Sequence, residues 1–285
     1  MIVDAHCHAW RRWPYRPEVP DPESRGRLDN LLFEMDGAGI DRAVVICAGI
    51  DHNPDNNADV AADILPHRDR FVMFADVDSR WTATHHSPGA AGRLGVLSDR
   101  YDLRGLTHYL REDAAEQGGW LLSPDGTAFM EEIGRRRLIL SLACAPHQMP
   151  AIAALADRHP RVPILLHHMA RVRDEPPGRS GVLDLLGVAR CGNVFVKMSG
   201  FGYAAGTGSA YPYDDLAWIV RIIAEAFGAS RMVWGSDYPV SRRYMTYRQT
   251  LECLRRQCRF MSSEDIDAVL GGTMQRLLDA AGPQA

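Results

Sequence analysis

Two histidines near the amino terminus, His6 and His8, are the residues whose type and spacing most directly suggest chemistry. They follow an apolar run and stand two positions apart, so on a β-strand both side chains point to the same side. Neighbouring imidazoles at a strand end can bind a metal ion or polarise a carbonyl oxygen. An H-x-H pair also occurs in loops without a shared function, so the rest of the sequence is needed to distinguish a functional pair from two unrelated histidines.

Further histidines and one aspartate follow other apolar runs. They are His108, His147, the adjacent pair His167 and His168, and Asp237. Polar groups at the ends of buried strands cost desolvation free energy unless they have a partner or a task. We predict that His6, His8 and another histidine hold a divalent ion or polarise a carbonyl, and that Asp237 completes the shell or acts as a general base. This set of residues indicates hydrolysis.

Strand geometry limits how the neighbouring residues can take part. Adjacent residues on a strand face opposite sides, so only one of His167 and His168 is expected to point inward. We favour His168, because it is closer to the following loop. Lys197 shares a strand face with Ser199 and is predicted either to reach a substrate oxygen or to pair with a structural carboxylate. The remaining histidines are predicted to be surface residues; they are His52, His67, His85, His86 and His159.

The elements that must position these residues are eight short apolar runs rich in Val, Ile, Leu and Phe. Without strict alternation of polar and apolar residues, such runs are typical of strands buried on both faces of a parallel sheet. The predicted strands cover residues 2–6, 42–47, 71–77, 103–108, 138–143, 164–168, 194–198 and 232–237.

Amphipathic stretches lie between these runs. Residues 214–227 carry apolar side chains at helical spacing and precede Gly228, a candidate C-cap, while residues 149–159 show the same period up to Pro160. A final helix is expected to begin near Ser262. Strands alternating with helices eight times predict an α/β fold, a (β/α)₈ barrel formed as one domain by residues 1–285. A doubly wound open sheet is the alternative, weakened because no G-x-G-x-x-G follows the first run.

Loops at the carboxyl ends of barrel strands build active sites. Two long loops, residues 10–22 and 200–213, would occupy such positions and therefore supply candidate substrate contacts. Surface packing explains these side chains equally well. The candidates are Arg11, Arg12, Trp13, Tyr15, Tyr203, Tyr211 and Tyr213.

Composition excludes several classes of function. The 285 residues include 32 Lys and Arg against 36 Asp and Glu, a net charge of −4, which gives no general attraction to nucleic acid or to an anionic membrane. Six scattered cysteines without a C-x-x-C pair favour free thiols over a disulfide scaffold. No leader-like or membrane-spanning segment is evident, so we expect a cytoplasmic protein with a small-molecule substrate, compatible with assembly into a homo-oligomer.

Several segments together resemble the amidohydrolase superfamily, in its branch of sugar-lactonase-like proteins. The most specific are the opening H-x-H and the last two segments of the series. The series comprises Val3-Asp4-Ala5-His6-Cys7-His8-Ala9-Trp10, Arg104-Gly105-Leu106-Thr107-His108, Leu121-Leu122-Ser123-Pro124, Pro146-His147-Gln148-Met149-Pro150, His167-His168-Met169-Ala170-Arg171, Val196-Lys197-Met198-Ser199-Gly200 and Trp234-Gly235-Ser236-Asp237-Tyr238-Pro239.

The resemblance implies a (β/α)₈ barrel that hydrolyses lactones of sugar acids or related small carboxylates. It implies a core site of His6, His8, His168 and Asp237, with Asp237 activating water. The predicted substrate contacts are His108, His147, Arg11, Lys197 and Tyr238. Members of this branch differ in metal use. The resemblance is therefore compatible with a divalent ion, zinc or manganese, held by the four core residues, and equally with a metal-free mechanism in which histidines polarise the carbonyl.

Three positions depart from the branch pattern: Thr107 replaces an Arg, His167 an Asp and Ala170 a Gly. The missing arginine removes an expected clamp for a substrate carboxylate, for which Arg104, Arg111 and Arg171 are neighbouring substitutes. Two other functions stay open. One is a metal-dependent decarboxylase or hydratase of a small unsaturated or aromatic acid on the same scaffold, and the other is a binding protein that has lost catalysis.

Overall fold

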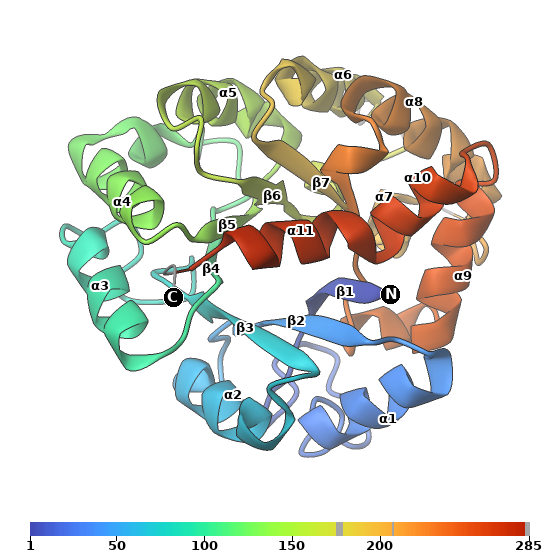
Figure 1. Cartoon of the computed structure of the whole chain (residues 1–285), viewed down its shortest axis with the longest axis horizontal. Helices are drawn as coiled ribbons and strands as arrows, with labels where there is room; N and C mark the ends of the chain where they lie inside the picture. Colours follow the sequence, from blue (N-terminus) through green and yellow to red (C-terminus); the bar gives the residue numbers. More distant parts are fainter. Residues whose placement is uncertain (175–178, 207, 283–285) are drawn as a thin grey trace.

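The computed structural model describes residues 1–174, 179–206 and 208–282. Within these residues, eight parallel strands follow one another around a barrel in chain order, each hydrogen-bonded to the next (Figure 1). This arrangement is the predicted (β/α)₈ barrel. The strands are β1 (Val3–Cys7), β2 (Arg42–Ile46), β3 (Phe71–Asp76), β4 (Gly105–Tyr109), β5 (Ile139–Ala143), β6 (Ile164–Leu166), β7 (Val194–Met198) and β8 (Met232–Trp234).

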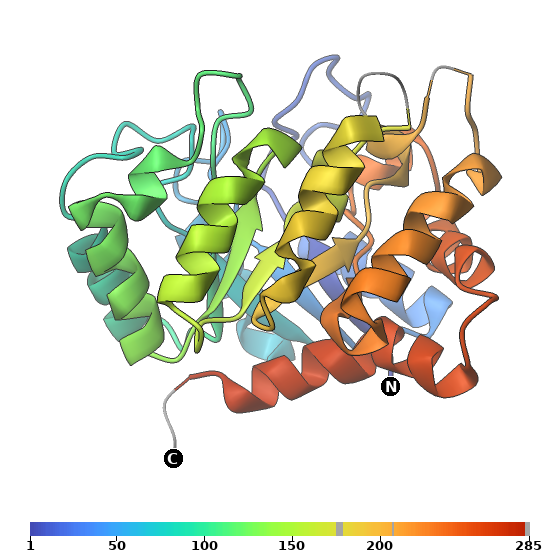
Figure 2. The ribbon, with the colours of Figure 1, turned by 90° about the horizontal axis from the view of Figure 1, so that it is seen from above.

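Helices surround the barrel, and α11 crosses the end that lies opposite the long loops (Figures 1 and 2). The connections also contain short 3₁₀ helices, among them η2 (Gly119–Leu122) and η3 (Pro146–Gln148). The α-helices are α1 (Leu28–Ala38), α2 (Asn56–Ile64), α3 (Ala90–Arg100), α4 (Pro124–Arg135), α5 (Met149–Arg158), α6 (Arg179–Gly187), α7 (Phe201–Ala204), α8 (Ala217–Phe227), α9 (Tyr247–Gln257), α10 (Ser263–Asp267) and α11 (Thr273–Ala280).

Backbone hydrogen bonds just beyond β1 and β8 draw the ends of the sheet together. The amide of Asp237 donates to the carbonyl of His6 (2.7 Å), and the amide of His8 donates to the carbonyl of Tyr238 (2.7 Å). A side chain at Gly235 would obstruct this approach, because its Cβ would lie 2.7 Å from the Cβ of His6. The closure therefore fixes Asp237 beside His6 and His8.

Two apolar layers explain why the strand sequences lack an alternating pattern. Inside the barrel, strand side chains pack on one another; they include Val44, Ile46, Phe74, Ile139, Leu165 and Val233. Outside, strand side chains of the opposite parity, among them Val45, Leu106 and Leu140, pack on helix side chains such as Leu31, Leu94 and Phe129. Because both faces of each strand are buried, both have to be apolar.

The predicted elements agree with the structure to within one residue except at three strand ends, one of which is the start of β4 at Gly105, two residues later than predicted. Residues 214–227 form a 3₁₀ turn followed by α8, which ends at Gly228 with φ 73°, and Ser262 caps α10. Strands β6 and β8 are shorter than predicted, because the chain turns into left-handed backbone at residues 168–171 and again at Asp237. Left-handed conformation is unfavourable for residues other than glycine and is concentrated at functional sites.

The interpretation of the cysteines agrees with the structure. All six are buried and none forms a disulfide. Among the described helices, none combines the length and apolar character that a membrane crossing requires.

Candidate active site

Four of the predicted site residues converge at the carboxyl ends of β1, β6 and β8. The Nε2 atoms of His6 and His8 lie 3.2 Å apart. The Oδ1 atom of Asp237 lies 3.6 Å from Nε2 of His6, 3.4 Å from that of His8 and 3.7 Å from that of His168. All four residues are at most 5% exposed. We call this group the inner cluster.

Neighbouring elements orient two of the imidazoles. The Nδ1 atom of His8 faces the carbonyl of Ile46 on β2 (2.9 Å), so it carries the proton and leaves Nε2 with a lone pair. The Nδ1 atom of His168 lies 2.9 Å from the hydroxyl of Ser199. Gly200, with φ 70°, allows this approach, because a Cβ there would lie 2.8 Å from the Cβ of His168. Both rings therefore present Nε2 to Asp237.

His167 also reaches the inner cluster, which the sequence analysis did not anticipate. Its ring centroid lies 4.4 Å from that of His6, compared with 4.6 Å for His168. The expectation that only one of the pair points inward is wrong, because β6 ends at Leu166 and His168 adopts φ 49°. Beyond that point the residues no longer alternate as they do along a strand.

Lys197 links His6 to His167 through a buried chain of hydrogen bonds. Its ammonium donates to the hydroxyl of Ser141 (2.7 Å) and lies 3.1 Å from Nδ1 of His6. The same hydroxyl is 2.7 Å from Nε2 of His167. Burial lowers the pKa of Lys197 to about 7. This lysine makes its polar contacts with an imidazole and a hydroxyl, so the expected pairing with a carboxylate is not what the structure shows.

The electrostatics of the inner cluster favour neutral imidazoles beside an ionised carboxylate. Burial lowers the pKa of His6 well below its ordinary value and that of His168 to about 3. Burial alone would raise the pKa of Asp237, but the neighbouring imidazoles of His168 and His8 and the hydrogen bond from Tyr203 outweigh it and lower the pKa. The Tyr203 hydroxyl, one of the predicted loop contacts, donates to Oδ2 of Asp237 at 2.5 Å. Asp237 is therefore ionised at neutral pH.

Donor atoms of His6, His8 and Asp237 lie within 4.8 Å of one another and fit a divalent ion, and His168 reaches the same carboxylate oxygen. Four atoms placed about 2.0–2.2 Å from a common ion at tetrahedral angles lie about 3.3–3.6 Å from one another. The separations from Asp237 Oδ1 to the three imidazole nitrogens are 3.4–3.7 Å, and His6 and His8 are separated by 3.2 Å. Outer hydrogen bonds on His8 and His168 are the kind that orient metal-binding imidazoles.

Four of the five predicted substrate contacts, His108 among them, lie outside the inner cluster. Arg11 pairs with Asp63 of α2 (2.7 Å) and is directed to that helix. Tyr238 is fully buried, and its ring packs against that of Tyr247 on α9, with centroids 5.6 Å apart. His147 lies on η3, where its Nε2 bonds to the carbonyl of Glu116 (3.0 Å).

His108 lies on the opposite side of the barrel wall from the inner cluster. It shares its parity on β4 with Leu106, which packs in the outer layer. Its Nδ1 donates to the carbonyl of Val77 (2.8 Å), and its ring stacks on Trp120, with centroids 5.3 Å apart. The expected convergence of His108 on the barrel mouth is therefore wrong, because the sequence did not reveal which face of β4 it occupies.

Two arginines add positive charge near the inner cluster. The guanidinium of Arg171 lies 5.2 Å from the ring of Tyr203, and Arg171 and Arg80 both pair with Glu112, at 3.3 Å and 2.6 Å. Arg171 was one of the substitutes considered for the missing arginine of the strand-four segment. Arg80 carries no recognisable sequence signal, because it lies in an irregular loop. Arg104, another substitute, faces the opposite end of the barrel.

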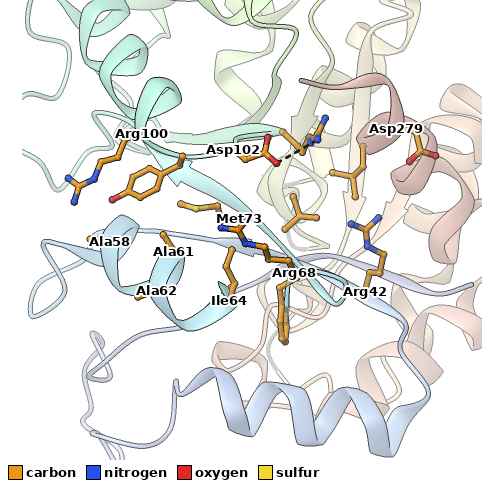
Figure 3. Close-up of a pocket in the computed structure, with 15 residues that line it drawn as sticks. Arg42, Ala58, Ala61, Ala62, Ile64, Arg68, Met73, Arg100, Asp102 and Asp279 are labelled. Carbon is orange, nitrogen blue, oxygen red and sulfur yellow. Dashed lines mark ion pairs between the residues drawn. The ribbon is translucent and has the colours of Figure 1, made fainter. Parts of the chain in front are cut away.

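A cavity of about 730 Å³ lies at that opposite end (Figure 3). It is bounded by the first residues of β2 and β3 and by α11, and its arginines are Arg42, Arg68, Arg100 and Arg104. In barrels of this type, the amino-terminal face contributes to stability and the carboxyl-terminal face to catalysis. The candidate active site is therefore the inner cluster, although this cavity is large.

Comparison with known proteins identifies the class of enzyme that this fold and site define. The model of a family described as Amidohydrolase matches residues 3–280, nearly the whole chain. The chain belongs to the amidohydrolase family, which assigns it to the hydrolases and agrees with the resemblance seen in its sequence.

The individual proteins that resemble this chain are 15–28% identical to it. An L-fucono-1,5-lactonase from Burkholderia ambifaria is 28% identical, over 95% of this chain and 92% of the relative. A zinc-bound amidohydrolase structure from Burkholderia multivorans superposes with a TM-score of 0.79 at 19% identity, covering 99% of this chain and 100% of the other. A probable 2-pyrone-4,6-dicarboxylic acid hydrolase from Acinetobacter baumannii, solved with citric acid, has a TM-score of 0.74 at 16% identity, covering 98% and 99%. Decarboxylases share the fold at 15% identity.

Proposed function

We propose that this enzyme hydrolyses a lactone of a sugar acid or of a related small carboxylate. The observation that carries the proposal is the position of the ionised Asp237 carboxylate, within 3.4–3.7 Å of the Nε2 atoms of three imidazoles. This arrangement places a proton acceptor beside groups that can polarise a carbonyl. The likeness to an L-fucono-1,5-lactonase supports a lactone as the substrate.

In the proposed reaction, Asp237 accepts a proton from water as the water oxygen attacks the lactone carbonyl carbon. The carbonyl oxygen becomes negative and is stabilised by an Nε2–H donor of His6 or His168, or by a metal ion that the inner cluster would hold through the Nε2 lone pair of His8. The ring C–O bond then breaks, and the proton passes from Asp237 to the departing ring oxygen. The products are a hydroxyl and a carboxylic acid on one open chain, so one water is consumed and Asp237 is regenerated.

The hydrogen bond between Lys197 and His6 separates a metal-dependent from a metal-free version of this reaction. If the Lys197 ammonium donates to Nδ1 of His6, the ring carries its proton on Nε2 and donates a hydrogen bond to the substrate carbonyl. If neutral Lys197 accepts a hydrogen bond from Nδ1–H of His6, Nε2 has a free lone pair. A divalent ion held by His6, His8, His168 and Asp237 would then supply Lewis-acid polarisation of the carbonyl.

We propose that Arg171 and Arg80 bind the carboxylate of the substrate. Both guanidinium groups already pair with the Glu112 carboxylate, so they stand where a second carboxylate would be attracted. Arginine recognises carboxylates with two parallel hydrogen bonds, which would also orient the lactone. In this role they replace the arginine that Thr107 does not provide.

The proposal is tested by measuring metal content and hydrolysis of a panel of sugar lactones, before and after chelation. Activity lost on chelation and regained with zinc or manganese supports the metal-dependent version. Full activity in metal-free protein supports direct polarisation by the histidines. Turnover of no lactone in the panel, by protein that has been reconstituted with either metal, would contradict the proposed substrate class.

A decarboxylase or hydratase on the same scaffold remains the alternative, but no contact in the site favours it. Structures of decarboxylases are similar to this chain in fold only. Release of carbon dioxide from a small aromatic or unsaturated acid, without lactone turnover, would establish it. Ligand binding without any turnover would instead support the binding-protein hypothesis.

A further inference from the structure

A second group of histidines lies outside the barrel wall. His85 and His86 belong to the loop between β3 and α3, and His108 belongs to β4. One ring nitrogen from each lies within 4.8 Å of the others, and the Nε2 atoms of His86 and His108 are 3.4 Å apart. His86 also stacks on Trp120, with centroids 4.6 Å apart and planes inclined by 7°. We call this group the outer cluster; the sequence analysis had assigned two of its members to the surface.

An oxygen atom lies beside Nδ1 of each ring of the outer cluster, within hydrogen-bond distance for His85 and His108 and at ion-pair distance for His86. A neutral imidazole carries its proton on the nitrogen that faces an acceptor, which leaves a lone pair on the other nitrogen. The Nε2 atoms of His85 and His108, and that of His86 in the same tautomer, then carry the lone pairs. The acceptors are the carbonyl of Asp78 for His85 (3.0 Å), the carboxylate of Glu116 for His86 (3.5 Å) and the carbonyl of Val77 for His108 (2.8 Å).

These lone pairs lack a donor between them. The Nε2 atom of His85 is buried and has no hydrogen-bond partner. The facing Nε2 atoms of His86 and His108 repel each other unless a proton or a cation lies between them. A cation satisfies all three nitrogens.

We propose that His85, His86 and His108 form a binding site for a divalent transition-metal ion of the zinc class. Neutral imidazoles suit zinc, copper and nickel, whereas magnesium and calcium prefer oxygen ligands. Carbonyl and carboxylate acceptors on the far ring nitrogens are the usual outer partners of metal-binding histidines. His85 stacks on His86, with centroids 3.7 Å apart, so its ring turns about its side-chain torsions when the ion binds.

The bound ion would tie the loop after β3 to β4. No residue of the outer cluster belongs to the inner cluster, so this site is independent of the proposed lactone hydrolysis. The two sites can therefore be loaded, removed and measured separately.

The test is zinc stoichiometry. Purified protein is stripped with a chelator, dialysed against buffered zinc and assayed by elemental analysis, for the wild type, His86→Gln and a matched control, His52→Gln, at an exposed position. We expect His86→Gln to bind one zinc ion fewer per chain than the wild type and the control. Equal stoichiometry in all three proteins would overturn the proposal, whether or not the inner cluster holds metal.

Two further variants keep the test decisive if His86→Gln folds poorly. His85→Gln should also lose one zinc ion per chain. Glu116→Gln removes the carboxylate that orients His86 and should weaken zinc binding at this site about 10–100-fold. Zinc affinity is measured in a His6→Ala, His8→Ala background, where the inner cluster cannot contribute two of its ligands. Unchanged affinity in both variants would overturn the assignment of these ligands.

Discussion

The inner and outer histidine clusters use the same side chain in different surroundings. The inner cluster combines three imidazoles with the Asp237 carboxylate and lies beside Lys197, at the barrel mouth. The outer cluster consists of three imidazoles and lies between β4 and the helices. In these rings the neighbouring oxygens lie beside Nδ1, on the side away from Nε2. A proton acceptor within the cluster permits hydrolysis, whereas imidazoles alone permit ion binding. The nature of the neighbouring group therefore decides what histidines can do.

Replacing Asp237, the proton acceptor of the inner cluster, should have the largest effect, and that effect should be confined to the inner cluster. We expect Asp237→Asn to reduce lactone hydrolysis about 10²–10⁴-fold, because the general base is lost. The zinc that depends on His86 should stay bound. Steady-state kinetics and elemental analysis measure the two outcomes, with Asp157→Asn, an exposed carboxylate, as the control. Turnover close to that of the wild type would remove Asp237 from the proposed role.

The pH dependence of the free energy of unfolding tests the end of β3, where the loop that leads to His85 and His86 begins. Asp76 ends β3 and accepts hydrogen bonds from the amides of Gly49 (2.8 Å) and Ser79 (3.2 Å), and burial raises its pKa from 3.8 to about 6. Between these values the folded state binds a proton that the unfolded state has released, so stability falls as the pH rises. The loss is about 3 kcal/mol at 1.36 kcal/mol per pK unit.

Asp76→Asn should abolish this part of the pH dependence. Urea unfolding between pH 4 and pH 7 gives the free energy of unfolding for both proteins. A decline of equal size in the variant would show that Asp76 titrates normally in the folded protein.

Removing the partner of one inner imidazole should have an intermediate effect. Ser199→Ala leaves Nδ1 of His168 without its hydrogen bond, and we expect kcat to fall about 10–100-fold with little change in KM. Ser199→Thr keeps the hydroxyl and should restore most of the activity. Zinc bound by the outer cluster should be the same in both variants. A fall of the same size in Ser199→Thr would indicate a packing effect instead.

Arg11→Ala should have the smallest effect. Arg11 pairs with exposed carboxylates of α2, and such surface pairs contribute about 1 kcal/mol or less. We expect unchanged kcat and KM and a small change in thermal stability. A large increase in KM would restore Arg11 as a substrate contact and would extend the inner cluster toward the first long loop.

The sequence by itself determined the barrel and the core of the inner cluster. Apolar runs of strand length, separated by amphipathic stretches, are enough to specify strands buried on both faces and alternating with helices. The spacing of His6 and His8 on one strand sets both rings on the same side. The carboxyl ends of parallel strands meet at one end of a barrel, so the approach of Asp237 to these rings also follows from the pattern.

Only the tertiary structure decided which other histidines join them. His167 keeps the inward parity of Leu165, and left-handed backbone at His168 turns the second ring into the inner cluster as well, a turn that strand periodicity cannot foresee. The parity of β4 directs His108 outward, where the loop after β3 delivers His85 and His86. A shift of one residue reverses the face of every strand side chain, and loop positions have no periodicity. Packing in three dimensions therefore fixed these contacts.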